Sequence, residues 1–261
     1  MKVFVLGHRG MLGHVVARYL RECGHEIFTS DIRYSGGPDD ALIEALRKTE
    51  ATWIINCIGK IPQKTANAAE LFMGNFQLPV HIKTYLRADQ RLLHASTDCV
   101  FSGKRGNYRV EDVPDPHDAY GLSKLLGESI AELGRCQVIR TSIIGPELDD
   151  GGKGLMAWFL KQKGPVNGFT NHWWNGITTL EWAKIADEIL TAKLKPTTPV
   201  FQTGSETTVT KCELLKLIGE SWRHPIQINP IQAPEAVNRT LEPVMKRSGL
   251  KSQLRELSSW M

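Results

Sequence analysis

The chain has 261 residues, which is enough for one large domain or for a main domain that carries a smaller lobe. Its net charge of +4 is spread along the sequence without a dense run of lysine or arginine, so we expect neither nucleic acid nor an anionic membrane as a partner. The five cysteines are odd in number and lack C-x-x-C pairs, and the eight histidines do not cluster, so the sequence indicates no disulfide framework and no metal site.

The N-terminal apolar run is short. It spans residues 2–6, and Gly7, His8 and Arg9 end it far below the length of a signal sequence or a membrane span. We therefore expect a cytoplasmic protein.

Apolar runs and helical patterns alternate along the first part of the chain. The predicted strands are residues 3–6, 26–30, 52–56, 91–95 and 137–140. The predicted helices are residues 11–20, 39–48, 68–86 and 120–133. Strands that are apolar almost throughout and alternate with helices are typical of a parallel sheet covered on both faces. The sequence therefore predicts an α/β fold with a doubly wound, Rossmann-like parallel sheet.

The sequence changes in character after Pro146. Residues 149–154 are rich in glycine and predict a flexible loop, and helices are predicted at 155–163, 180–194 and 211–219. Repeated prolines interrupt the chain beyond Lys195. We therefore divide the chain into a dinucleotide-binding domain at 1–146 and, at 147–261, mainly a small C-terminal substrate lobe with some segments returning to the first domain.

A glycine-rich turn follows the first predicted strand and opens the first predicted helix. This context favours a nucleotide site, because glycines let the backbone approach a pyrophosphate and the helix N-terminus supplies amide donors. The spacing is G-x-x-G-x-x-G, which differs from the G-x-G-x-x-G dehydrogenase pattern. The residues that we assign to a cofactor here are Gly7, Arg9, Gly10, Met11, Leu12 and Gly13.

The sequence gives conflicting signals on the cofactor. Asp31 ends the second predicted strand, where a carboxylate would accept from a ribose hydroxyl and favour NAD. Arg9 and Arg33 are placed to bind a ribose 2′-phosphate and favour NADP. The alternative is that Asp31 and Arg33 are merely solvated turn residues. We expect NADPH with NADH also accepted, and we add residues Cys57, Ile58 and Gly59 to the cofactor site.

Tyr120 and Lys124 lie four residues apart at the start of a predicted helix. That spacing places both side chains on one face, where the ammonium would lower the pKa of the phenol and suit it to proton donation. Thr97 follows the strand at 91–95 and is placed to hydrogen-bond a substrate carbonyl next to Tyr120.

Several motifs together resemble the extended short-chain dehydrogenase/reductase family. Within it, the segments 96–101, 111–112, 120–128 and 140–142 look like the dTDP-4-dehydrorhamnose reductase group, and residues 7–11 are similar to the turn of GDP-fucose synthases. The resemblance implies a reductase of a nucleotide-linked 4-keto-6-deoxy sugar. Hydride would pass to the sugar ketone, Tyr120 would donate the proton, Lys124 would hold the nicotinamide ribose, and Thr97 would orient the carbonyl.

One position departs from the family dehydratases. They carry an Asp-Glu pair after the threonine, whereas this chain has Asp98 and Cys99, which disfavours dehydration. Cys99 occupies the place of an epimerising cysteine in GDP-fucose synthases, so the chain could be an epimerase-reductase; a small cysteine that fills a gap is the alternative. Lys153 is the only nearby base that the sequence offers.

Further candidates are weaker. Trp173 and Trp174 could stack on the substrate or pack inside the lobe, Arg239 could bind a substrate diphosphate or be solvated, and Asn75 could order the site or cap a helix. His8 and His14 are interpreted as turn and helix-surface residues. A non-catalytic nucleotide-binding subunit remains a third hypothesis, and the oligomeric state stays open between a monomer and a homodimer.

Overall fold

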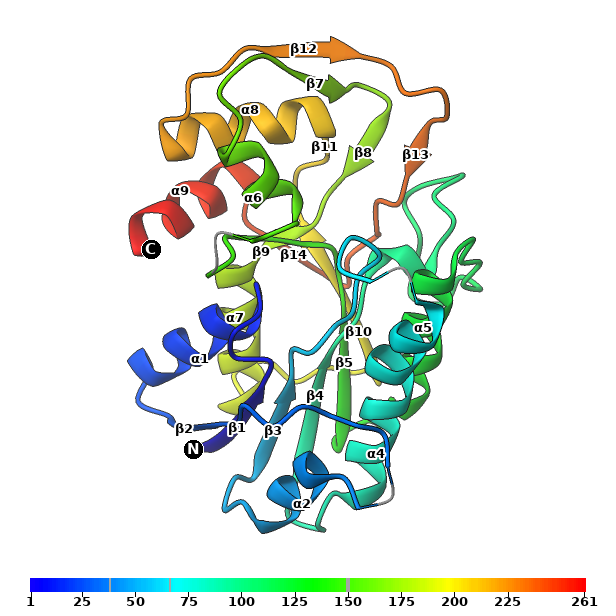
Figure 1. The fold of residues 1–261 in the computed structure, drawn as a ribbon, viewed down its shortest axis with the longest axis vertical. Helices are drawn as coiled ribbons and strands as arrows, with labels where there is room; N and C mark the ends of the chain where they lie inside the picture. The colour runs from blue at the N-terminus through cyan, green and yellow to red at the C-terminus, as the bar shows by residue number, and fades with distance from the viewer. Residues whose placement is uncertain (38, 66, 149–150) are drawn as a thin grey trace.

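The computed structural model describes residues 1–37, 39–65, 67–148 and 151–261. A seven-stranded sheet lies at its centre (Figure 1). The strands are β1 (Lys2–Leu6), β2 (Glu26–Thr29), β3 (Trp53–Asn56), β4 (Arg91–Ala95), β5 (Cys136–Arg140), β10 (Val200–Ser205) and β14 (Met245–Arg247). Their order is β14-β10-β5-β4-β3-β1-β2, and every neighbouring pair is parallel. The predicted doubly wound α/β fold is confirmed.

Each central strand buries side chains on both faces of the sheet. In β1, Val3 and Val5 belong to one core and Phe4 and Leu6 to the other. The helices of this part are α1 (Gly13–Glu22), α2 (Ala41–Lys48), α4 (Leu78–Tyr85), α5 (Ala119–Gly127) and α7 (Thr179–Leu190). Figure 1 shows α1 and α7 together on one side of the sheet and α4 and α5 on the other. Apolar residues at both strand parities therefore produce the two-sided burial.

The strand order reverses beside β1. This strand pairs with β2 on one side and with β3 on the other, so the chain crosses the sheet between them. The segments that leave the carboxyl ends of β1 and β3 separate there and open a crevice, which is where open α/β sheets bind their ligands.

The predicted long helix at 68–86 is divided into three segments. α3 (Ala68–Phe72) leads into a π-helical turn (Met73–Gln77), and α4 follows. Asn75 lies in that turn and is buried; its side chain exchanges hydrogen bonds with the backbone of Lys60 at 2.8 and 2.9 Å and donates to Ser123 at 3.0 Å. The local widening of the helix thus ties the β3 loop to α5, a use of π-turns that is common near functional sites.

Other predicted bounds shift at helix ends. The helix expected to reach residue 133 ends at Gly127 and continues as a short 3₁₀ turn (Glu128–Ile130). The helices predicted at 155–163 and 180–194 end at Leu160 and Leu190, whereas the one predicted at 211–219 extends to Trp222. Arg223 stops it in the left-handed region with φ of 53°.

The smaller lobe is built from short strands and three helices. Its helices are α6 (Leu155–Leu160), α8 (Lys211–Trp222) and α9 (Leu250–Trp260), and its strands are β7 (Val166–Phe169), β8 (His172–Trp174), β11 (Val209–Thr210), β12 (Ile228–Ile231) and β13 (Val237–Asn238). β7 pairs with β12, and β8 pairs with both β11 and β13. A separate core that includes Trp174, Phe159 and Leu214 lies among them.

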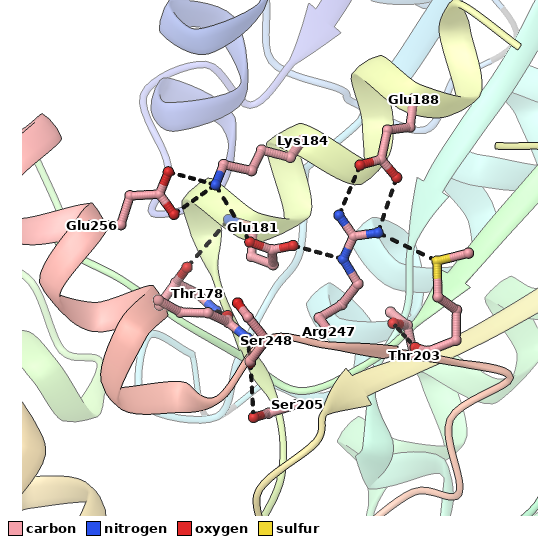
Figure 2. Close-up of polar contacts among 11 residues, drawn as sticks. Thr178, Glu181, Lys184, Glu188, Thr203, Ser205, Arg247, Ser248 and Glu256 are labelled. Atoms are coloured by element: carbon pink, nitrogen blue, oxygen red, sulfur yellow. Dashed lines mark hydrogen bonds and ion pairs between the residues drawn. The ribbon is translucent and has the colours of Figure 1, made fainter. Parts of the chain in front are cut away.

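Charged side chains of α7 hold the sheet strand β14 and the lobe helix α9 (Figure 2). Arg247 of β14 donates to Glu181 at 2.6 Å and to Glu188 at 2.8 Å, both in α7. Lys184 of α7 donates to Glu256 of α9 at 2.6 Å. The network thus joins the last strand and the last helix to α7, which packs on the sheet. The short strands β6 (Ile143–Ile144) and β9 (Ile177–Thr178) pair with each other, and β9 leads directly into α7. Within the described residues, no helix is both long and apolar enough to span a bilayer.

Candidate active site

A cleft of about 490 Å³ lies at the carboxyl ends of β1, β3, β4 and β5, under the lobe. The predicted site residues that line it are Gly10, Met11, Leu12, Cys57, Ile58, Gly59, Thr97, Cys99, Tyr120, Lys124, Trp174 and Arg239. Six of the predicted residues lie outside the lining: Gly7, Arg9, Gly13, Asp31, Arg33 and Trp173. Another hollow of about 490 Å³ lies beside α8 between Lys216 and Ile228 and contains none of them. Catalytic and cofactor candidates from distant parts of the sequence therefore share one cleft.

The glycine turn fits a dinucleotide pyrophosphate. Gly7 has φ of +75°, and a Cβ on Gly13 would lie 2.1 Å from the Gly7 carbonyl oxygen, so only glycine allows the close return of the chain. No side chain caps α1 in the described structure, and no acceptor there takes the amide N–H groups of Met11 and Leu12. These free donors at a helix N-terminus suit an anion.

Asp31, which is expected to favour NAD, and Arg9, which is expected to favour NADP, form an ion pair. Arg9 donates to Asp31 at 2.7 Å, and the ring of His8 lies 3.5 Å from the same carboxylate. Arg9, Asp31 and Arg33 are all exposed. The pair places a guanidinium next to a carboxylate, so the two groups expected to favour different cofactors are in direct contact.

The surface position expected for His14 is wrong. The ring is buried, and its Nδ1 lies 2.8 Å from the Gly10 carbonyl oxygen. Burial lowers the pKa of His14. His14 lies in the first turn of α1 and supports the glycine turn through this contact with the Gly10 carbonyl.

Thr97 and Tyr120 come together because α5 begins against the turn after β4. Asp118 caps the helix by accepting from Gly121 at 2.7 Å. A Cβ on Gly121 would lie 2.3 Å from the Cys99 carbonyl oxygen, so glycine allows the helix to approach this turn. The Thr97 hydroxyl donates to Asp98 at 3.0 Å and accepts from the Cys99 amide at 3.2 Å. To donate to a substrate ketone, the hydroxyl must turn away from Asp98.

The expectation that Lys124 lowers the Tyr120 pKa towards neutrality is wrong in this structure. Burial raises the pKa of the Tyr120 phenol, Cys99 and Asp98 raise it further, and the Thr97 hydroxyl opposes them. The Lys124 ammonium donates to the Ala95 carbonyl at 2.5 Å, and burial lowers its own pKa to about 8. The free-energy cost of burying a tyrosinate therefore exceeds the stabilising effect of Lys124 that the spacing predicted. The phenol is protonated at neutral pH.

A buried ion pair supports Lys124 from below. Arg140 of β5 donates to Glu128 at 2.5 and 2.9 Å, and Ser96 donates to the same carboxylate at 2.6 Å. Glu128 also opposes the lowering of the Lys124 pKa. Glu128 and Arg140 belong to motifs that the sequence marks, but their pairing depends on a contact between β5 and the 3₁₀ turn after α5 that no local pattern reveals.

Cys99 faces the cleft as a thiol. Burial and the neighbouring Asp98 raise its pKa to about 12, so the thiolate is disfavoured. Lys153 is exposed and does not line the cleft. Asp149 and Asp150, the first residues of the predicted loop, lie outside the described residues.

The structure separates the two tryptophans. Trp174 is buried in the lobe core, lines the cleft and donates to Ser142 at 2.7 Å. Trp173 is 37% exposed and lies outside the cleft lining, as expected for successive residues of a strand. Arg239 lines the cleft and donates through Nε to the Phe101 carbonyl at 3.0 Å.

Lys211 is a residue of the cleft that sequence reasoning missed. It is the first residue of α8, and its ammonium lies 5.2 Å from the centre of the Trp174 ring. A lysine after the helix cap Thr210 is locally indistinguishable from a solvated one. Only the fold of the lobe brings it to the cleft.

Comparisons with known proteins agree with this geometry. A "dTDP-4-dehydrorhamnose reductase" from Burkholderia thailandensis is 29% identical over 139 residues, which cover 51% of this chain and 47% of that protein. A "probable low-salt glycan biosynthesis reductase Agl14" from Haloferax volcanii is 32% identical over 147 residues, covering 49% of this chain and 48% of that protein. The matched part thus spans about half the length of these curated relatives.

The fold is shared over the whole chain. The structure of dTDP-4-dehydrorhamnose reductase from Bacillus anthracis in complex with NADP superposes on this chain with a TM-score of 0.85 at 15% sequence identity. The superposition covers 100% of this chain and 99% of the Bacillus anthracis chain. The family described as "RmlD substrate binding domain" matches residues 1–261. The resemblance inferred from the motifs is therefore confirmed, and the chain belongs to the RmlD substrate binding domain family.

Proposed function

We propose that the protein is an NADPH-dependent reductase of a nucleotide-linked 4-keto-6-deoxy sugar, with NADH as a weaker substitute. One observation carries this proposal: Thr97, Tyr120 and Lys124 line the same cleft as the glycine turn. The family membership and the relatives named as reductases support the same chemistry.

The cofactor residues follow from the geometry of the turn. The free amides of Met11 and Leu12 would bind the pyrophosphate, and Arg9 and Arg33 would bind a ribose 2′-phosphate. Asp31 would accept from the ribose hydroxyl of NADH, which explains why both cofactors are expected. Residues 57–59 would lie along the cofactor, and Lys124 would donate to the nicotinamide ribose.

The chain positions the ketone and supplies a proton. NADPH, when bound, supplies the hydride that reduces the sugar ketone. Tyr120 donates its phenolic proton to the carbonyl oxygen, which its raised pKa permits because the phenol remains protonated. The Thr97 hydroxyl turns from Asp98 to the carbonyl and fixes its direction. Lys124, protonated below about pH 8, stabilises the negative charge that develops on Tyr120.

The epimerase-reductase hypothesis has less support. Cys99 lines the cleft, but its raised pKa works against a thiolate that removes a proton beside the ketone. Lys153, the partner base suggested by the sequence, is exposed. A non-catalytic nucleotide-binding subunit would not need Thr97, Tyr120 and Lys124 in one cleft.

A substrate panel tests the proposal. NADPH oxidation at 340 nm is followed with the purified protein and 4-keto-6-deoxy sugars linked to dTDP, UDP or GDP, each prepared with a 4,6-dehydratase that is removed before the assay. We expect oxidation of NADPH with at least one of these sugars and none with the corresponding 4-hydroxy sugars. Tight NADPH binding without oxidation for any ketone would instead support the non-catalytic hypothesis.

A further inference from the structure

Lys211 is a cation without a hydrogen-bonding or ionic partner in the part of the chain that the structure describes. It is half-buried and lines the cleft, and among residues 1–37, 39–65, 67–148 and 151–261 no carboxylate pairs with its ammonium and no acceptor receives a hydrogen bond from it. Its described contact is the face of Trp174, at 5.2 Å from the ring centre. Burial lowers the pKa of Lys211, as expected for a charge that is withdrawn from water.

A second cation approaches from the same lobe. Arg239 lines the cleft, and its charge adds to the lowering of the Lys211 pKa, whereas Asp98 and Cys99 oppose it. One nitrogen of Arg239 is used by the Phe101 carbonyl and another lies 3.3 Å from the ring of His117. The remaining donors of the guanidinium are available to a ligand. Two neighbouring cations thus meet at the side of Thr97 to Cys99 that faces the lobe.

The position of these cations separates them from the cofactor. The cofactor pyrophosphate belongs at the glycine turn, at the carboxyl end of β1, whereas Lys211 and Arg239 come from α8 and from the segment after β13. A sugar whose ketone lies at Tyr120 carries its diphosphate on the opposite side of the ring. Each phosphate carries a negative charge, and a charge-assisted hydrogen bond to it would compensate for the buried ammonium.

We propose that Lys211 binds the diphosphate of the nucleotide sugar together with Arg239, and that Trp174 holds the lysine side chain in place for this contact. The inference rests on the proposed function and adds a residue that selects substrates with a nucleoside diphosphate. Lys211 is a binding residue, and it takes no part in the transfer of hydride or proton.

Calorimetric titration of dTDP, and separately of UDP, tests this role with protein saturated with NADP⁺, so that the cofactor site is filled. Lys211→Met keeps the length of the side chain over Trp174 and removes the charge. Lys211→Arg restores a cation, and Lys216→Met is the matched control, because Lys216 is exposed on the same helix and outside the cleft. We expect Lys211→Met to weaken binding of the better diphosphate about tenfold or more. Lys211→Arg should recover most of the affinity, and Lys216→Met should bind as the wild type does.

Thymidine and uridine serve as ligands without phosphate. We expect Lys211→Met to leave their binding unchanged; an equal loss for nucleoside and diphosphate would show that the lysine acts only by packing, and would overturn the inference. Wild-type affinity for the diphosphate in Lys211→Met, or no binding of either diphosphate by the wild type, would also overturn it. If the diphosphate result holds but no 4-keto sugar oxidises NADPH, the proposed function fails and the role of Lys211 stands.

Discussion

The sheet domain and the lobe differ in how strongly the local sequence predicts their strands. In the sheet domain, each of the strands β1, β3 and β4 contains a run of two to four consecutive apolar residues and is paired with its neighbours in the sheet. In the lobe, strands of two to four residues pair across long separations, as Val166 with Ile228 and His172 with Val237. Local patterns therefore position Tyr120 and the glycine turn, whereas the residues that we propose to bind the substrate depend on long-range assembly. Changes in the sheet domain should therefore affect turnover and global stability, and changes in the lobe should affect substrate binding.

The largest expected effect comes from Tyr120→Phe. Loss of the phenolic proton should lower kcat about 10²- to 10⁴-fold, because general acid catalysis contributes on that scale. NADPH affinity should be unchanged in fluorescence titrations. Tyr85→Phe is the matched control, since Tyr85 is 40% exposed at the end of α4. Near-normal kcat in Tyr120→Phe would remove this residue from the mechanism.

Arg140→Met tests the buried support of the sheet domain. Glu128 would be left as a buried carboxylate without its partner, so the free energy of unfolding should fall by about 3–5 kcal/mol in urea denaturation. Lys251→Met removes an exposed ion pair with Glu220 at 2.9 Å and should lower the free energy of unfolding far less than Arg140→Met does. Equal losses for the two variants would contradict the importance assigned to the buried pair.

The pH dependence of turnover tests Lys124. Its lowered pKa of about 8 means that the ammonium is present below this pH and is lost as the pH rises through it. We expect kcat/KM to fall by up to about tenfold per pH unit above about pH 8, as for loss of one essential proton. The profile is measured from pH 6 to pH 10 with NADPH saturating. A flat profile to pH 9.5 would show that the neutral amine serves equally well.

The smallest expected effect compares the tryptophans of the lobe. Trp174→Phe loses the hydrogen bond to Ser142 and should lower the free energy of unfolding by about 1 kcal/mol and raise KM for the sugar, with kcat nearly unchanged. Trp173→Phe should change stability by less than about 0.5 kcal/mol and leave KM unchanged, because Trp173 lies outside the cleft lining. A larger KM effect for Trp173 would reverse their assignment.

Sequence patterns identify most of the sheet domain. The runs at β1, β3 and β4 and the glycine turn are visible because burial on both faces and a tight turn each restrict local residue choice. The sequence does not predict β10, β14 or α9. The second half of β10 contains the buried polar residues Gln202, Thr203 and Ser205. Gln202 and Thr203 donate hydrogen bonds to the backbone carbonyls of Tyr108 and Met245, which are distant in sequence. Such a strand lacks the run of apolar residues by which a buried strand is recognised in a sequence.

The candidate site divides in the same way. Tyr120, Lys124 and Thr97 can be found because their spacing and their place after strands are local features. The raised pKa of Tyr120 cannot, since it results from burial beneath neighbouring elements. Lys211 cannot either, because the contact with Trp174 joins residues that only the antiparallel pairing of β8 and β11 brings together.

Transfer of deuterium from labelled NADPH tests the central claim most directly. The protein is incubated with (4-²H)NADPH, in both stereoisomers of the label, and with the 4-keto sugar nucleotide that the panel selects. The account predicts that one of the two labelled cofactors places a single deuterium at C4 of the sugar product, detected by mass spectrometry and proton NMR. A product without deuterium from either cofactor, or no product at all while NADPH is bound, would contradict it.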